Sequence, residues 1–332
     1  MHYPVLCFIS DFIKFFIFAD MLGTQLARLF HSTSCNLSGA SKSMLAELRK
    51  KTGYTFANCK KALETNNNDL AQAEKWLQEQ AQALGWAKAS KLQGRAASQG
   101  LLGVSVENNH ASIVEVNCET DFVAKNGTFK SFVELVTSSC LQLSKQQKNF
   151  SDSIAKTIIG NEQLKNSPCS DGKSLADHTA LAIGSVGENV ILSRALCLSV
   201  DGDLKLAGHV HPPSEKTSFP LLGRFAAVVV FKANPHTEIT EKVGKQLCQH
   251  IIGMNPSAVG NPETDKPAED PDSEKNLIFQ HFLINSEVTV QELLQEHNMT
   301  VVDFCRFECA EEFETQEKSA AQQAGNSMQK LR

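Results

Sequence analysis

The segment Glu115-Val-Asn-Cys-Glu-Thr-Asp-Phe-Val-Ala-Lys125 marks the point where the hydrophobic pattern of this chain changes. Before it, apolar residues alternate with polar ones on either side of Asn108-Asn109, a pattern typical of a β-hairpin. After it, apolar residues recur every three or four positions, as on one face of a helix: Phe129, Phe132, Val133, Val136, Cys140 and Leu143. The sequence therefore predicts two strands, a short connection and a long amphipathic helix.

The second half of the chain repeats the order strand, strand, helix. The segments that carry this repeat are the strands 190–198 and 205–210, joined by the turn Asp201-Gly202-Asp203, then the buried strand 225–231 and the helix 238–252. In that helix the residues expected to face inward are Ile239, Val243, Leu247 and Ile251. We therefore predict an α+β fold with a duplicated core of two subdomains, residues 100–185 and residues 186–310.

The end of the second subdomain departs from this scheme. Between residues 260 and 276, prolines and acidic residues replace apolar ones, which predicts an exposed, mobile acidic loop. An extended segment at 277–284, a helix at 288–297 and a strand at 301–309 are expected after it. Residues 311–332 show no apolar face and predict a polar tail.

Residues 43–85 predict a separate docking domain of three short helices. The first ends at Thr52-Gly53, and a loop of asparagines with Asn68 as N-cap precedes the third. The second helix, at 55–64, is expected to turn four residues inward: Phe56, Cys59, Ala62 and Leu63. Such a bundle resembles the ubiquitin-associated type. Basic residues outnumber acidic ones nine to five between 42 and 92, which favours an acidic partner over a merely solvated helix face.

Residues 1–42 predict a targeting segment. The apolar run at 8–18 is interrupted by charges and too short to span a bilayer. Residues 21–45 contain arginine, lysine, serine and threonine but no acidic residue, which is typical of a mitochondrial presequence. A disordered tail is the alternative, and either Met1 or Met21 is compatible with the start of translation.

Composition and motifs favour a binding protein over an enzyme. The net charge of −5 argues against a nucleic-acid binder, and the ten cysteines are scattered without a Cys-x-x-Cys pair, as expected of reduced core residues. Gly172-Lys173-Ser174 lacks the first glycine of a phosphate-binding loop. His209 and His211 have no third ligand nearby in the sequence, so neither a metal nor a cofactor is predicted.

Two motifs together resemble the elongation factor Ts family. Leu48-Arg49-Lys-Lys-Thr52-Gly53, followed by Cys59-Lys-Lys-Ala-Leu63, is similar to its amino-terminal signature, and residues 115–125 are similar to its second signature. Val186-Gly187-Glu188-Asn189 is a weaker match. The resemblance covers about residues 43–310. The presequence fits the mitochondrial branch, as does the acidic loop at 260–276 in place of the helical hairpin expected in bacterial members.

The resemblance implies guanine nucleotide exchange on elongation factor Tu in mitochondrial translation. A protein of this family binds the GDP-bound and nucleotide-free partner, as an expected 1:1 heterodimer in the mitochondrial matrix. It would need no cofactor, no membrane and no direct contact with nucleic acid. Exchange would proceed by disturbance of the magnesium and phosphate site of the GTPase, without an active site in this chain.

The resemblance also implies the site residues. Thr120, Asp121, Phe122 and Val123 would form a wedge that dislocates the magnesium ion, and Val186 and Gly187 would pack beside it. Leu48, Arg49, Thr52 and Gly53 would dock on the nucleotide domain. The residues alone also allow a purely structural interpretation, in which Asp121 is a helix N-cap and Phe122 is a core residue. One departure is His211-Pro212-Pro213, where the family tends to have His-Gly, so a partner contact at His211 is not expected.

Two other functions are alternatives to nucleotide exchange. A ubiquitin-associated adaptor would bind ubiquitin through residues 43–85 and use the rest of the chain as scaffold. An RNA-binding accessory protein would rest on the basic helices alone, and its RNA binding would depend strongly on salt. Neither assigns a role to Phe122.

Overall fold

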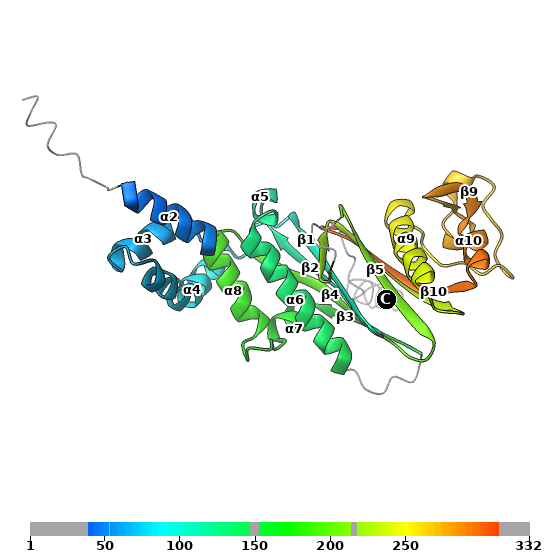
Figure 1. The fold of residues 1–332 in the computed structure, drawn as a ribbon, viewed down its shortest axis with the longest axis horizontal. Helices are drawn as coiled ribbons and strands as arrows, with labels where there is room; N and C mark the ends of the chain where they lie inside the picture. Colours follow the sequence, from blue (N-terminus) through cyan, green and yellow to red (C-terminus); the bar gives the residue numbers. More distant parts are fainter. Residues whose placement is uncertain (1–38, 53, 147–152, 214–217, 312–332) are drawn as a thin grey trace, which may run out of the picture. The chain divides into compact units, whose positions relative to one another are not determined.

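The computed structural model describes residues 39–52, 54–146, 153–213 and 218–311 (Figure 1). Most of the predicted targeting segment and all of the tail from residue 312 lie outside these ranges. The chain divides into two compact units between Glu47 and Leu48, and the contacts described below lie within the second. None of the helices in the described ranges is long and apolar enough to cross a membrane.

The helices near the amino terminus are α2 (Gly39–Thr52), α3 (Phe56–Thr65) and α4 (Leu70–Leu92). The N-cap of α4 is Asp69, whose carboxylate accepts hydrogen bonds from the amides of Ala71 and Gln72, and not the neighbouring Asn68. In α3, Cys59, Ala62 and Leu63 are buried as predicted. The third helix ends at Leu92, seven residues beyond the predicted end of the docking domain at residue 85.

The first sheet has five antiparallel strands in the order β3-β4-β2-β1-β6. Its strands are β1 (Gln99–Glu107), β2 (His110–Cys118), β3 (Ile154–Gly160), β4 (Val190–Val200) and β6 (Leu221–Gly223). The β1–β2 hairpin closes at Asn108, whose φ of 52° suits an asparagine turn. One sheet face packs against α6 (Gly127–Gln146) and α8 (Leu175–Val186), which lie side by side in Figure 1.

The second sheet has three antiparallel strands in the order β10-β7-β5. They are β5 (Leu204–His211), β7 (Phe225–Ala233) and β10 (Met299–Glu308). The inner face of β7 contributes Ala226, Val228 and Val230 to a core shared with the first sheet. Its outer face contributes Ala227, Val229 and Phe231 to a core with α9 (Glu238–Met254) and α10 (Val290–Glu296). This continuous apolar strand is therefore buried on both faces, as the sequence predicted.

The two sheets approach closely at Gly208 on β5. A methyl group at this position would lie 2.9 Å from side-chain atoms of both Val104 and Val106 on β1. Only a residue without a side chain allows the strands to pack at this distance. The α+β class is thus confirmed as two packed sheets, each covered by helices on its other face (Figure 1).

Several predicted details differ from the structure. Phe56 and Ile239, expected inside, are 56% and 62% exposed. They occupy the first and second positions of α3 and α9, and because helical side chains lean toward the N-terminus, theirs extend beyond the first turn. The strand β3 and the short helix α7 (Asn161–Asn166) were not predicted. β3 is an edge strand with mostly exposed side chains, so it lacks the apolar pattern of a buried strand.

The predicted boundary between the two subdomains, at 185/186, does not separate the two sheets. Strands on both sides of it belong to the first sheet. The strand β4, on the carboxyl side, pairs with β2 and β3, and β6 pairs with β1. The duplication of the core stays a prediction. After α9, the chain forms the short helices η1 (Pro271–Ser273) and η2 (Leu277–Phe279) and the two-stranded sheet of β8 (His281–Phe282) and β9 (Asn285–Thr289).

The acidic segment 260–276 is largely exposed but contains one buried carboxylate. Glu274 accepts hydrogen bonds from the backbone amides of Ala268, Lys275 and Asn276, at 2.7 to 2.8 Å. Because a buried carboxylate needs such partners, this residue organises the turn around itself. The eight cysteines in the described ranges are all buried, as expected of core residues.

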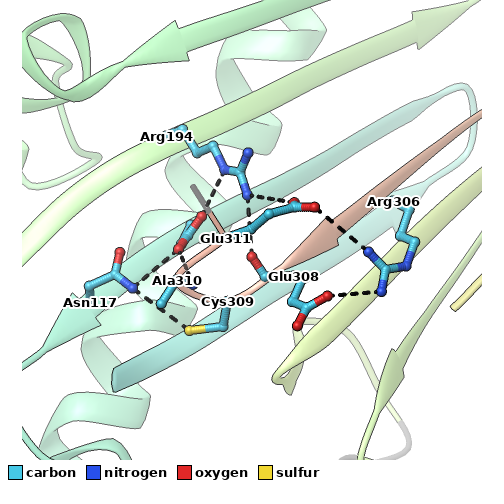
Figure 2. Close-up of polar contacts among 8 residues, drawn as sticks. Asn117, Arg194, Arg306, Glu308, Cys309, Ala310 and Glu311 are labelled. Carbon is cyan, nitrogen blue, oxygen red and sulfur yellow. Dashed lines mark hydrogen bonds and ion pairs between the residues drawn. The ribbon is translucent and has the colours of Figure 1, made fainter. Parts of the chain in front are cut away.

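A network around a buried ion pair joins the residues that follow β10 to the first sheet. Arg194 on β4 donates through Nε to Oε2 of Glu115 on β2, at 2.7 Å, and both side chains are almost fully buried. The other oxygen of Glu115 accepts from the amide of Ala310 at 2.7 Å, and Arg194 also reaches Glu311 (Figure 2). The guanidinium lies 4.3 Å from the centre of the Phe307 ring. This network fixes where the chain leaves the core.

Substitution of Arg194 by methionine tests the network. The change leaves the Glu115 carboxylate buried without its cation, which is expected to lower the free energy of unfolding by about 3–5 kcal/mol. Lys165→Met, which breaks an exposed pair with Glu162, is the control and is expected to cost less than about 1 kcal/mol. Urea unfolding followed by circular dichroism measures both. Equal losses in the two variants would contradict the assignment.

Candidate functional site

The connection between β2 and α6 is a single helical turn, α5 (Asp121–Ala124). Thr120 is its N-cap, in extended conformation, and its hydroxyl accepts a hydrogen bond from the amide of Val123. The thiol of Cys118 donates to the carbonyl of Thr120 at 3.2 Å, and burial raises the pKa of this thiol to about 12. The turn is therefore anchored on the inside by groups that stay neutral at physiological pH.

The four residues of the predicted wedge divide between the core and the surface. Val123 is buried in the core beneath α6, whereas the ring of Phe122 is 80% exposed. The interpretation of Phe122 as a core residue is therefore wrong. Asp121 is not the N-cap of α5, a position that Thr120 occupies, and its half-exposed carboxylate pairs with Lys125 at 2.8 Å. The hydrogen bond from Lys125 holds the pKa of Asp121 below its usual value.

Two carboxylates tie this turn to the loop that follows α8. Glu188 accepts hydrogen bonds from both the amide and the hydroxyl of Thr120, at 3.0 and 2.7 Å. In return, Glu119 accepts from the amide of Asn189 at 2.7 Å, and it lies 3.5 Å from Arg95. Because hydrogen bonds to charged groups are stronger than neutral ones, these exchanged contacts hold the two loops as one unit.

The loop after α8 begins with a left-handed residue. Gly187 caps the helix with φ +82°, and its amide donates to the carbonyl of Ile183. A methyl group at Gly187 would lie 3.4 Å from the side chain of Thr55, the N-cap of α3. Asn58 and Lys88 both donate to the carbonyl of Gly184, at 3.3 Å. The start of α3 therefore lies against the end of α8, next to the loop that holds the Thr120 turn.

The structure brings most of the predicted site residues into this region. Val186 and Gly187 lie at the end of α8, joined through Glu188 to Thr120. Of the four predicted docking residues, Arg49 is exposed and Thr52 is partly buried, with its hydroxyl donating to the carbonyl of Leu48 at 2.6 Å. Leu48 itself is 1% exposed, so its side chain packs beneath this surface and does not form it. Gly53 lies outside the described residues.

Sequence reasoning missed the residues that position the site. Glu119 and Glu188 belong to the two sequence motifs, but nothing in their spacing shows that each binds the other loop. Glu119 binds Asn189, 70 residues away in the chain, and Glu188 binds Thr120, 68 residues away. The exposed ring of Phe56 was missed because its spacing matched a buried helix face. His211, the last residue of β5, is exposed and lies near the ring of Phe225, the first residue of β7.

Comparisons with known proteins identify the family of this chain. Residues 27–87 match the family model described as "Elongation factor Ts, mitochondrial, N-terminal", and residues 119–270 match the model "Elongation factor TS". The chain is similar to "Elongation factor Ts, mitochondrial" of Aedes aegypti, with 47% identity over 90% of this chain and 98% of that protein.

The chain belongs to the mitochondrial elongation factor Ts family.

Other family members match over most of their length as well. The protein of the same name from Drosophila melanogaster is 46% identical over 89% of this chain and 95% of its own length, and that of Homo sapiens is 39% identical over 82% and 85%. The elongation factor Ts model that begins at residue 119 contains both the Thr120 turn and the loop after α8. The resemblance inferred from the two motifs is confirmed.

Replacement of Glu188 by glutamine tests the tie between the two loops. A glutamine offers one neutral acceptor oxygen to the two Thr120 donors, so about 1.5–3 kcal/mol of local stability is expected to be lost. Hydrogen exchange of the Thr120 and Val123 amides should accelerate about tenfold or more. The exposed Glu162→Gln serves as control. Unchanged protection of both amides would refute the role of Glu188.

Removal of the positive charge beside Asp121 tests the origin of its lowered pKa. In Lys125→Met the pKa of Asp121 is expected to rise toward its ordinary value, because the hydrogen bond and the nearby charge are both lost. Carboxyl carbon shifts in an NMR pH titration report the change, and Lys145→Met, which breaks the pair with Glu107, is the control. A lowered pKa in both variants would assign the effect to the backbone of α5.

Proposed function

We infer that this chain is the guanine nucleotide exchange factor for elongation factor Tu in mitochondrial translation. Membership of the elongation factor Ts family carries this function. The family matches cover both the helical module, formed by α2, α3 and α4, and the turn formed by Thr120 and α5. The protein acts in the mitochondrion as a binding protein for the GTPase.

We propose that Phe122 is the group that enters the partner. An aromatic side chain that is 80% exposed, yet carried by a turn with a buried Val123 and a double hydrogen bond to Glu188, is unusual on a free surface. Rigid aromatic residues that project into a pocket dominate the energetics of many interfaces. This observation supports the wedge formed by Thr120, Asp121, Phe122 and Val123 more strongly than any other feature of the chain.

The chemistry of exchange accounts for an acid beside the ring. A nucleotide bound with nanomolar affinity is held by about −12 kcal/mol, so its unaided release is slow. A partner that binds the empty GTPase more tightly lowers the affinity for nucleotide by a certain factor, and bound nucleotide lowers the affinity for the partner by the same factor. Asp121, ionised at neutral pH, is suited to compete for the groups that hold the magnesium ion between the phosphates.

The helical module supplies a second part of the proposed surface. Arg49 and Thr52, supported by the buried Leu48, would dock on the nucleotide domain together with Gly53. Phe56 follows Thr55, whose side chain lies near Gly187, and provides a second exposed aromatic ring at the start of α3. We propose that both parts engage the GDP-bound and nucleotide-free partner in a 1:1 complex in the mitochondrial matrix. The adaptor alternative finds no support among the comparisons.

Substitution of Phe122 by alanine tests the wedge. Release of a fluorescent GDP analogue from elongation factor Tu is expected to slow by about tenfold or more at saturating exchange factor, because the interaction acts while nucleotide leaves. Affinity for the nucleotide-free GTPase should change less than the rate. Stopped-flow fluorescence gives the rate and calorimetry gives the affinity.

Phe219→Ala is the matched control for this experiment. Phe219 lies by the Asn108-Asn109 turn, at the opposite end of the β1–β2 hairpin from Cys118 and the wedge. Its loss should leave both the rate and the affinity unchanged. If Phe122→Ala promotes exchange at the rate of the unmodified protein, the wedge proposal is wrong. The exchange function itself is tested separately, by the activity of the unmodified protein.

A further inference from the structure

The loop that precedes α8 gathers three metal-binding side chains away from the proposed wedge. Cys169, Asp171 and His178 place one ligand atom each, a thiol sulfur, a carboxylate oxygen and an imidazole nitrogen, within 4.8 Å of one another. No other group of three such side chains meets this condition in the described ranges. We propose that the three residues bind one divalent ion of the zinc class, with a fourth coordination position open to water.

The backbone of the loop brings the first two ligands together. The amide of Cys169 donates to the carbonyl of Lys173 at 2.8 Å, and the amide of Gly172 donates back to the carbonyl of Cys169 at 3.0 Å. Gly172 has φ +81°, a conformation that other residues rarely adopt, and it allows the chain to reverse within five residues. Pro168 and Ser174 form an antiparallel bridge that closes the loop.

The third ligand reaches the loop from the first turn of α8. His178 is the fourth residue of the helix, and helical side chains lean toward the N-terminus, which directs the imidazole back over the loop. Its side chain is only 13% exposed, and its Nε2 atom lies 3.1 Å from Oδ2 of Asp171. The neighbouring Asp177 is engaged in a capping box with Ser174 and does not belong to the cluster.

The spacing of the ligand atoms suits a tetrahedral ion. Zinc bonds of about 2.0–2.3 Å place neighbouring ligand atoms about 3.3–3.6 Å apart, close to the observed separation of Nε2 and Oδ2. The ligand atoms lie within 4.8 Å of one another, so the sulfur needs to move closer by about 1.2–1.5 Å at most for a bond of this length. Ser139 donates a hydrogen bond to Sγ of Cys169 at 3.6 Å and would support the thiolate from the outer shell.

The charges balance when the ion binds. The thiol of Cys169 releases its proton to solvent, and the thiolate and the Asp171 carboxylate together supply two negative charges against the two positive charges of the ion. The neutral imidazole of His178 contributes a lone pair through Nε2, the atom that faces Asp171. A mixed sulfur, nitrogen and oxygen set selects zinc-like ions over magnesium or calcium, which prefer oxygen alone.

Cobalt(II) is the spectroscopic probe for this site. The full chain, treated with a chelator and kept reduced, is titrated with Co²⁺ alone, and the thiolate-to-cobalt charge-transfer absorbance is recorded. One equivalent is expected to develop the band, and Zn²⁺ should abolish it by displacement. In Cys169→Ser the band should be absent. In Asp171→Asn and His178→Gln the cobalt affinity should fall by about tenfold or more.

His281→Gln, which alters an exposed histidine in the short sheet after η2, is the matched control and should titrate like the unmodified chain. Circular dichroism checks that each variant is folded, and because the three variants change different ligands, the misfolding of one leaves two that test the site. The proposal fails if the unmodified chain develops no charge-transfer band. It fails equally if the band persists in Cys169→Ser, or if Asp171→Asn and His178→Gln bind cobalt as tightly as the control.

Discussion

An exposed aromatic ring can act on a partner only when the backbone beneath it is held in place, and here two carboxylates hold it. Glu188 accepts both donors of Thr120, and Glu119 accepts the amide of Asn189, so each loop supplies the acceptor for the other. The single turn of α5 is too short to be stable alone. Its order therefore comes from tertiary contacts: Val123 in the core below and the charged hydrogen bonds to the loop beside it.

The framework that supports this pair of loops consists of two sheets with a shared core. β2 ends at Cys118, one residue before Glu119, and β4 begins at Val190, directly after Asn189. The two strands are neighbours in the first sheet, paired from Cys118 and Val190 onward. The sheet register thus sets the distance between the loops, and the buried pair of Glu115 and Arg194 lies across the same two strands.

Much of this arrangement follows from the sequence. The hairpin at Asn108 and the amphipathic α6 each carry a clear periodicity, β7 is a continuous apolar run, and the structure confirms all three. Periodicity fails where few side chains are buried, as in the edge strand β3, and at the first positions of helices, where Phe56 and Ile239 are exposed. Contacts between residues far apart, such as Thr120 with Glu188, leave no trace in local spacing. The resemblance implied the residues of the proposed wedge, but only the structure shows that Phe122 is exposed while Leu48 is buried.

The burial of β7 on both faces limits which substitutions this strand can accept. Residues 226, 228 and 230 fill one core, and residues 227, 229 and 231 fill the other. A larger side chain at any of them displaces a backbone that both cores share, so a mutation that strains one layer also loosens the other. Few substitutions in this strand are therefore expected to be neutral. A larger residue would need compensating substitutions in the core on each side of the sheet.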